Sequence, residues 1–268
     1  MAFKSLFWDL MTMKLRARKN KKETRPRPTI FHYYENESSG ITEFRRLARN
    51  IRYRGNPSEI KSFLVTSAMK GEGKSFIAAR LAIATATRES DKKVLLMDCD
   101  LRRPVMHKLF GIKKRPGLSS FITERRGLSE VIYGTELDNL SLIPSGRLTN
   151  SPVELLIRAK DVFDECKSKF DIVICDSPPV VPVDDVGIIA PYVDGVLMVV
   201  LAGKTDKMVV KRATEILTDA KAKVLGSVLN NFHGRLPYYY DYRYYRYGYD
   251  YGNEGKETQN ENINGDIL

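Results

Sequence analysis

The amino-acid sequence predicts an α/β protein with a doubly wound, mainly parallel sheet flanked by helices. From about residue 41 to 236, short apolar runs alternate with longer amphipathic segments, which is typical of strands and helices that follow one another along a chain. The runs at 94–97 and 196–201 are apolar without interruption, and this indicates strands covered on both faces, as in a parallel sheet. Such a sheet holds its ligand beyond the carboxyl ends of its strands.

The same patterns predict each element in chain order. We expect longer helices at 42–53, 75–89, 152–168 and 205–221, and shorter ones near 103–110, 128–133 and 184–190. The expected strands are 61–66, 93–98, 140–144, 171–176, 195–201 and 224–230. A chain of 268 residues is long enough for one such domain with appendages, and we assign the domain to residues 41–236.

The first 30 residues differ from the domain in composition. One face of a short helix would be apolar there, and it would carry Phe3, Leu6, Phe7, Leu10 and Met11. Residues 14–27 follow with eight basic side chains and one acidic side chain. An apolar stripe beside a basic tract suits an anionic membrane surface or a membrane-bound partner. The alternative interpretation is a disordered leader.

Residues 237–268 are expected to form a flexible tail. Their first half is rich in tyrosine and has no aliphatic face to bury, so the segment should stay solvated and mobile. The tyrosines are Tyr238, Tyr239, Tyr240, Tyr242, Tyr244, Tyr245, Tyr247, Tyr249 and Tyr251. They are candidate acceptors of a phosphoryl group. Alternatively, such a tail binds RNA, polysaccharide or itself by stacking.

Composition excludes several classes of protein. The net charge of +11 is concentrated in residues 14–27, so the domain gives no sign of binding nucleic acid. The three cysteines, Cys99, Cys166 and Cys175, have neither disulfide-framework nor metal-site spacing, and buried thiols fit a reducing compartment. No apolar run approaches the length of a membrane span, and the N-terminus lacks a signal-peptide pattern. We therefore expect a cytoplasmic protein.

A glycine-rich loop from Ala68 to Ser75 joins a predicted strand to a predicted helix. Loops in this position aim backbone N–H groups and a helix N-terminus at one point, which suits a triphosphate. Lys74 would bridge the β- and γ-phosphates, and the Ser75 hydroxyl would ligate Mg²⁺. The candidate nucleotide-binding residues are Lys70, Gly71, Glu72, Gly73, Lys74, Ser75 and Phe76. Ala68 replaces a glycine of the general pattern, so a turn with a chance Gly-Lys-Ser is the alternative.

Acidic residues follow two further strands directly. Asp98 and Asp100 lie at the end of one apolar run, and Asp176 lies at the end of another. Carboxylates at neighbouring strand ends hold Mg²⁺ directly or through water, and one of them could take the proton from an incoming hydroxyl. Each alone could be a simple strand-end cap. Together with the loop they predict a nucleotide-processing site.

These motifs resemble those of the bacterial tyrosine kinases of the polysaccharide-synthesis type, within the MinD/ParA group of P-loop ATPases. The resemblance spans about residues 41–251 and rests on the loop 70–75, the acidic motif 98–104, the Asp-Ser-Pro-Pro motif 176–179 and the tyrosine cluster. It implies a P-loop NTPase-like fold, ATP, Mg²⁺ and autophosphorylation in trans on the tail. Two departures are Lys70, where the family usually has proline, and Met69, where MinD/ParA proteins have a signature lysine.

The resemblance also implies roles for single residues. Lys74, Asp98, Asp100 and Asp176 would be catalytic, with Asp98 as the base, and Ser75, Asp98 and Asp176 would hold the metal. Arg102 would join the nucleotide site, and Asn230 would contact adenine. Glu43, Arg46 and Arg49 match an E-x-x-R-x-x-R pattern that packs subunit on subunit in a ring; otherwise they belong to a solvated basic helix.

The partners implied by the resemblance are a homo-oligomeric ring with docked tails and a separate transmembrane modulator of the polysaccharide co-polymerase type. Sugar-pathway enzymes are possible further substrates, and no nucleic acid is expected. The protein would work at the inner face of the cell membrane as an ATP:protein-tyrosine phosphotransferase that regulates capsular or exopolysaccharide synthesis. The alternatives are a MinD/ParA-like ATPase switch and a nucleotide-binding scaffold of an export complex.

Overall fold

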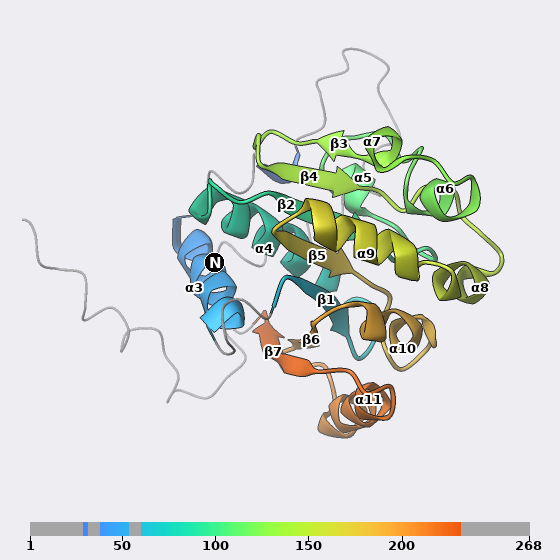
Figure 1. Cartoon of the computed structure of the whole chain (residues 1–268). Helices are drawn as coiled ribbons and strands as arrows, with labels where there is room; N and C mark the ends of the chain where they lie inside the picture. The colour runs from blue at the N-terminus through green and yellow to red at the C-terminus, as the bar shows by residue number, and fades with distance from the viewer. Residues whose placement is uncertain (1–28, 32–37, 54–59, 232–268) are drawn as a thin grey trace, which may run out of the picture. The chain divides into compact units, whose positions relative to one another are not determined.

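A computed structural model describes residues 29–31, 38–53 and 60–231, and Figure 1 shows them as a seven-stranded sheet between two layers of helices. The strands lie in the order β3-β4-β2-β5-β1-β6-β7. Their bounds are β1 Ser62–Ser67, β2 Val94–Asp98, β3 Tyr133–Gly134, β4 Leu140–Ile143, β5 Ile172–Asp176, β6 Gly195–Leu201 and β7 Val224–Asn230. Every pairing is parallel except that of β3 with β4. The predicted fold class is confirmed.

The strand order determines where a ligand site can form. The chain leaves β1 for β2 on one side, returns through β5 between them, and then crosses to β6 and β7 on the other side. The carboxyl ends of β1, β2 and β5 are therefore neighbours, with Asp98 directly opposite Asp176 in the register. Loops that leave a sheet at such a reversal form the ligand-binding crevice of an open α/β fold.

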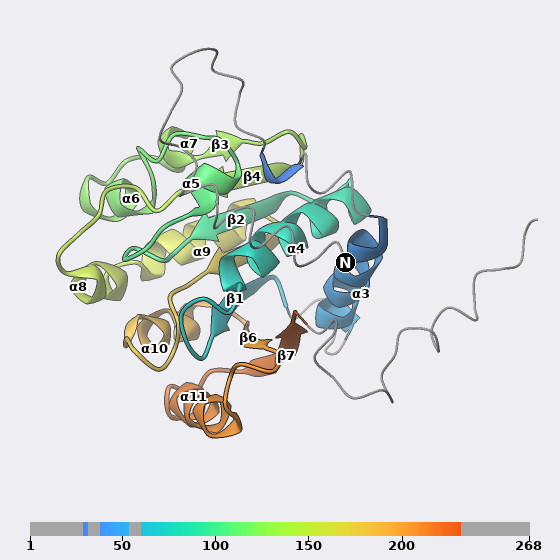
Figure 2. The same cartoon turned by 180° about the vertical axis from the view of Figure 1, so that it is seen from behind.

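The helices cover both faces of the sheet, as a comparison of Figures 1 and 2 shows. Helices α3, α4 and α5 pack on one face, while α6 to α11 pack on the other. Their bounds are α3 Ser38–Tyr53, α4 Lys74–Arg88, α5 Met106–Leu109, α6 Leu118–Thr123, α7 Leu128–Val131, α8 Pro152–Ile157, α9 Lys160–Lys169, α10 Asp185–Ile189 and α11 Lys207–Asp219, and a short 3-10 helix spans Ala190–Tyr192.

Two apolar cores result from this layering. Alternate residues of one strand enter opposite cores, so that Val94 and Leu96 face α4 while Leu95 and Met97 face the other layer. All five residues of β2 and all five of β5 are buried, which explains their unbroken apolar pattern. The buried alanines of α4 have small side chains, so this helix lies close to the sheet.

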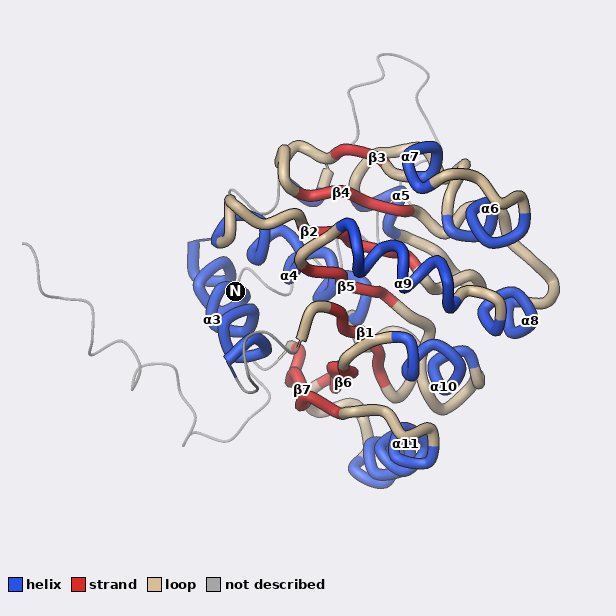
Figure 3. Tube along the Cα trace, in the orientation of Figure 1, coloured by secondary structure: helices blue, strands red, loops and turns tan. Residues whose placement is uncertain are grey.

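The predicted elements agree with the structure to within a few residues at their ends except at four places, most of which are easy to follow in Figure 3. The helix expected at 152–168 is two helices, α8 and α9, because the backbone tightens into i→i+3 hydrogen bonds at Arg158 and Ala159. Leu156 and Phe163, on either side of the break, are both fully buried. Helix α6, the 3-10 helix Ala190–Tyr192 and the two-residue strand β3 were not predicted.

The predicted segments at the two ends lie almost entirely outside the described residues, which begin at Thr29 and end at Asn231. The helix face of Phe3 to Met11, the basic tract and the tyrosine cluster stay predictions. Within residues 29–31, 38–53 and 60–231, no helix has both the length and the apolar composition needed to cross a membrane.

Candidate active site

Two glycines with positive φ angles shape the loop between β1 and α4. Gly71 has a φ of +84° and Gly73 a φ of +91°, values that residues with a side chain rarely adopt. A Cβ on Gly73 would also lie 2.3 Å from Nδ2 of Asn230, so a larger residue does not fit there. Because α4 starts at the next residue, its unpaired N-terminal N–H groups adjoin the loop. This is the arrangement of an anion-binding loop.

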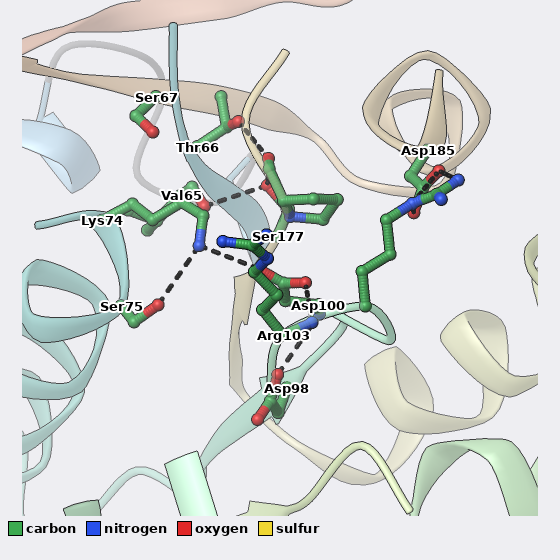
Figure 4. A network of polar contacts seen from close by, with 12 residues as sticks. Val65, Thr66, Ser67, Lys74, Ser75, Asp98, Asp100, Arg103, Ser177 and Asp185 are labelled. Atoms are coloured by element: carbon green, nitrogen blue, oxygen red, sulfur yellow. Dashed lines mark hydrogen bonds and ion pairs between the residues drawn. The ribbon is translucent and has the colours of Figure 1, made fainter. Parts of the chain in front are cut away.

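Lys74 is the cation of this loop, and Figure 4 shows its ammonium group between Ser75 and Asp100. Its Nζ atom lies 3.0 Å from Oδ2 of Asp100 and 3.4 Å from Oγ of Ser75. Burial lowers the pKa of Lys74, but the negative charges of Asp176, Asp100 and Asp98 outweigh burial and raise it overall. Lys74 therefore stays protonated at neutral pH.

Asp98 and Asp100 fold the loop that leaves β2. The carboxylate of Asp98 accepts the N–H of Asp100 at 3.2 Å and the N–H of Met106, the first residue of α5, at 3.1 Å. The other carboxylate oxygen of Asp100, Oδ1, accepts the N–H of Arg103 at 2.8 Å. Both carboxylates are thus positioned by the backbone of their own loop, and each keeps part of its accepting capacity for another partner.

Asp176 faces Asp98 from the neighbouring strand, and both side chains are fully buried. The Ser75 hydroxyl and the Ser177 N–H lie near the carboxylate of Asp176 and lower its pKa, but neither carboxylate oxygen makes a hydrogen bond of ordinary geometry within the described part of the chain. Burial raises the pKa of Asp176 to about 6, against the lowering effect of the Lys74 charge. Burial and the neighbouring Asp176 raise the pKa of Asp98 well above its ordinary range.

These residues suit a magnesium ion that is completed by other ligands. Among the described residues, no group of three or more His, Cys, Asp or Glu side chains is arranged to hold a metal ion by itself. Mg²⁺ usually keeps several waters and takes one or two carboxylates together with phosphate oxygens. The carboxylate of buried Asp176, whose oxygens make no hydrogen bond of ordinary geometry among the described residues, fits that requirement, and the predicted ligands Ser75 and Asp98 adjoin it.

The side chain of Arg102 pairs with the carboxylate of Asp185, at the start of α10. Its Nη2 and Nε atoms lie 2.8 and 3.0 Å from the two oxygens of Asp185, whose side chain is fully buried. The pair joins the loop after β2 to the segment after β5. The predicted contact between Arg102 and the nucleotide stays a prediction.

The other predicted nucleotide-binding residues lie around the loop. Lys70 and Gly71 are exposed, whereas Glu72 is buried and its carbonyl oxygen accepts Nδ2 of Asn230 at 2.8 Å. The Phe76 ring packs under the guanidinium of Arg80, 4.8 Å from its carbon. Asn230 therefore adjoins the phosphate loop, and its predicted contact with adenine stays a prediction.

The three residues of the predicted subunit interface lie on the exposed side of α3. Glu43, Arg46 and Arg49 are all solvent-exposed, and Oε1 of Glu43 pairs with Nη1 of Arg46 at 2.9 Å. On the opposite side of α3, Phe44 packs over the guanidinium of Arg80. The predicted phosphoacceptors, Tyr238 to Tyr251, lie outside the described residues.

Sequence reasoning missed the partners that support the predicted residues. Asp185 holds Arg102 across 83 positions of sequence, and Thr205 donates a hydrogen bond to Glu72 across 133 positions. No local pattern links such distant residues. The one available signal was Glu72 itself, an acidic side chain inside a loop expected to bind phosphate.

Comparisons with known proteins agree with this geometry. The ParA family model described as NUBPL iron-transfer P-loop NTPase matches residues 59–267. Tyrosine-protein kinase YwqD of Bacillus subtilis is 33% identical over 230 residues, which are 85% of this chain and 95% of YwqD. Tyrosine-protein kinase CpsD of Streptococcus agalactiae is 33% identical over 221 residues, 81% of this chain and 90% of CpsD.

A solved structure extends the likeness to three dimensions. The kinase domain of the Escherichia coli tyrosine kinase ETK superposes with a TM-score of 0.71 at 27% identity, over 82% of this chain and 86% of that domain. The matched region includes the phosphate loop and the acidic strand ends of the present chain. The chain therefore belongs to the bacterial tyrosine-protein kinases, among the ParA-like P-loop NTPases.

Proposed function

We propose that this protein is an ATP-dependent protein-tyrosine autokinase that transfers the γ-phosphoryl group of ATP to tyrosines of its own tail in trans. The observation that carries the proposal is the convergence of Lys74, Asp98, Asp100 and Asp176 at the adjoining ends of β1, β2 and β5. A cation and three carboxylates beside an anion-binding loop are the parts that phosphoryl transfer requires.

Lys74 would bind the phosphates by exchanging its partner. Its ammonium group now pairs with Asp100, and a triphosphate in the loop offers oxygens of higher charge to the same donor. Asp100 released in this way gains accepting capacity at Oδ2, while Oδ1 stays bound to the Arg103 N–H. The exchange would therefore couple nucleotide binding to the acidic loop without unfolding it.

Asp98 is the proposed general base. A carboxylate with a raised pKa accepts a proton more readily than an exposed one, which suits the activation of a tyrosine hydroxyl near neutral pH. The tyrosine proton would pass to Asp98 as the tyrosine oxygen forms its bond to the γ-phosphorus. The bond from that phosphorus to the oxygen bridging to the β-phosphate breaks, and ADP leaves with the electron pair.

Asp176 and Ser75 would hold Mg²⁺, with Asp98 beside them. The bound ion would neutralise charge on the phosphates during transfer. Ionised Asp176 is required for this role, and since its pKa is about 6, it is mostly ionised at pH 7 but loses its charge in mildly acidic solution.

The finer assignments rest on the resemblance to the polysaccharide-synthesis kinases. We assign to the protein a homo-oligomeric state through the exposed face of Glu43, Arg46 and Arg49, a separate transmembrane modulator, and the control of capsular or exopolysaccharide export at the inner membrane face. Each phosphate adds about −1.5 to −2 charges at neutral pH. Several of them on residues 238–251 would make docked tails repel one another, so phosphorylation would act as an assembly switch.

The test is to incubate the purified full chain with Mg·ATP and to record its intact mass and the peptides that cover residues 238–251. Additions of one phosphate each, confined to those peptides, are expected for the native chain. Asp98→Asn should abolish them, whereas Asp91→Asn, a matched change at an exposed surface carboxylate, should not. An equal extent of labelling in Asp98→Asn would show that Asp98 is not the base.

Release of free phosphate from an unmodified tail would overturn the autokinase and favour the ATPase switch. Binding of ATP with neither release nor transfer, also after addition of membranes that contain a polysaccharide co-polymerase, would favour the scaffold. Sizing before and after full phosphorylation tests the assembly switch, and an unchanged oligomer would contradict it.

A further inference from the structure

Glu72 is an unexpected residue for the middle of a phosphate-binding loop. It stands between Gly71 and Gly73, and its negative charge would repel a triphosphate if its side chain faced the ligand. The side chain is instead buried, with 3% of its surface exposed. Its Oε1 atom contacts Thr205, which follows β6, and the backbone carbonyl of Glu72 contacts Asn230 at the end of β7, whereas the Lys74 side chain points toward Asp100 beyond β2. The carboxylate is thus directed away from the catalytic side of the loop.

Both carboxylate oxygens of Glu72 accept hydrogen bonds from outside their own residue. Oε2 accepts the N–H of Met69 at 2.8 Å, which closes the loop on itself. Oε1 accepts the hydroxyl of Thr205, in the loop between β6 and α11. Hydrogen bonds to a charged acceptor are stronger than neutral ones, so these two bonds offset the cost of burying the carboxylate.

The contacts continue as a closed ring through both strand ends. The Thr205 hydroxyl also accepts the N–H of Leu201 at 3.1 Å. The N–H of Ala202 donates to the carbonyl oxygen of Asn230 at 2.9 Å, and Nδ2 of Asn230 donates to the carbonyl oxygen of Glu72 at 2.8 Å. We call these five residues, Glu72, Leu201, Ala202, Thr205 and Asn230, the brace.

We infer that Glu72 is a positioning residue, and that the brace holds the phosphate loop in its binding conformation from the side opposite the catalytic residues. The inference rests on the proposed nucleotide site. None of the brace bonds uses Lys74, Ser75 or the N-terminal N–H groups of α4, so phosphates bound in the loop do not have to break them. The Lys74–Asp100 pair, in contrast, has to exchange. The loop is therefore pre-organised by one side while the other side rearranges.

The brace makes a prediction that a merely stabilising contact would not make. If it sets the shape of the phosphate loop, its loss should weaken the binding of ligands that carry phosphates in the loop and should leave the binding of the nucleoside unaffected. Thr205→Val removes the hydroxyl at nearly constant volume, and Thr205→Ser keeps it. Thr218→Val is the matched control, because the Thr218 hydroxyl donates to the carbonyl oxygen of Thr214 within the same helix and takes no part in the brace.

The experiment measures the binding of ADP, ATP and adenosine to the full-length variants by calorimetry with Mg²⁺ present. Thr205→Val and Glu72→Ala should bind ADP and ATP about tenfold more weakly, which corresponds to about 1.4 kcal/mol, with adenosine binding unchanged. The affinities for ADP and ATP should be the same in Thr205→Ser, Thr218→Val and the native protein. The affinity of Glu72→Gln should lie between those of the native protein and Glu72→Ala, because an amide accepts hydrogen bonds at its oxygen only. Native affinity for ADP in Thr205→Val, or an equal loss for adenosine, would overturn the brace.

Hydrogen exchange without nucleotide gives a second, independent readout. The Met69 and Leu201 amides should exchange faster in Glu72→Ala and Thr205→Val respectively, because each loses its acceptor, and unaltered protection would contradict the brace. This measurement also separates the two proposals. A native chain that fails to bind ADP yet shows the expected exchange would overturn the nucleotide site and keep the brace as a structural device only.

Discussion

The two sides of the phosphate loop differ in chemistry. Toward β2 and β5 lie three acidic residues and the Lys74 cation, beside strands whose residues are all buried. Toward β6 and β7 lie a threonine hydroxyl, an asparagine amide and backbone groups that surround Glu72, and the edge strand β7 is partly exposed along its whole length. One side is a cluster of interacting charges, and the other is a hydrogen-bonded ring around a single charge.

The difference indicates a division of labour. Charges in a buried cluster strongly perturb one another, so a ligand or a proton that enters on the β2–β5 side redistributes all of them. The β6–β7 side consists of bonds that a phosphate group does not compete for. We therefore expect substitutions on the β2–β5 side to change the rate of phosphoryl transfer and its pH dependence. Substitutions on the β6–β7 side should change the affinity for the nucleotide.

The largest effect is expected for Lys74→Met. This substitution removes the cation that faces Asp100, Asp98 and Asp176, and the loss of a pre-organised electrostatic contact of this kind reduces transfer by about a thousandfold or more. Quantitative phosphotyrosine analysis of residues 238–251 measures it, with circular dichroism as the check on folding. Transfer at the native rate by a folded Lys74→Met protein would show that the β2–β5 side is not the catalytic side.

In the absence of Mg²⁺ and nucleotide, the stability of Asp176→Asn is expected to differ from that of the native protein by an amount that depends on pH. The pKa of Asp176 is about 6 in the folded protein and ordinary, near 3.8, in the unfolded chain. Between those values the folded state binds more protons, so this group's contribution to stability falls as pH rises. The free energy of unfolding of Asp176→Asn should therefore exceed that of the native protein by about 3 kcal/mol at pH 8. This difference should disappear as the pH falls toward 4.

Urea titrations of both proteins from pH 4 to 8 measure this gap. Asp138→Asn, a change at an exposed carboxylate, is the control and should follow the native profile. A gap that stays constant with pH would mean that Asp176 does not titrate in this window, and the charge-cluster description of the β2–β5 side would fail.

A smaller effect, and one of opposite sign, is expected for Arg102→Ala, which should lose stability. Asp185 is fully buried, and Arg102 is the only ion-pair partner recorded for it among the described residues. Removal of one partner of a buried pair leaves a buried charge uncompensated, and since Arg102 is itself 38% exposed, we expect a loss of about 2 kcal/mol. Arg102→Ala combined with Asp185→Asn should recover part of it in chemical denaturation. Strict additivity of the two changes would contradict the pairing.

The contrast between the two sides of the phosphate loop also explains which features could be predicted from the sequence. Apolar runs predicted every described strand except β3 to within one residue at either end. The rule that ligands gather at strand carboxyl ends then placed Lys74, Asp98 and Asp176 at one edge of the sheet, where the structure has them. Local pattern was sufficient there because the two aspartates end their own strands and Lys74 opens the helix that follows β1. Asp185 and Thr205 lay beyond prediction, since their contacts depend on how distant loops meet. The break between α8 and α9 was also missed, because the apolar periodicity continues through it.

The smallest effect is expected for Arg46→Ala, far from either side of the loop. Arg46 and Glu43 form an exposed pair one turn apart on α3, with side chains 47% and 52% exposed, and such pairs contribute about 0–1 kcal/mol. The free energy of unfolding at low protein concentration should therefore change by less than about 0.5 kcal/mol, and ADP affinity should not change. Sedimentation of the same variant measures assembly separately. A large loss of monomer stability would show that the exposed face of α3 supports the fold itself, and the proposed subunit interface would lose its independence from it.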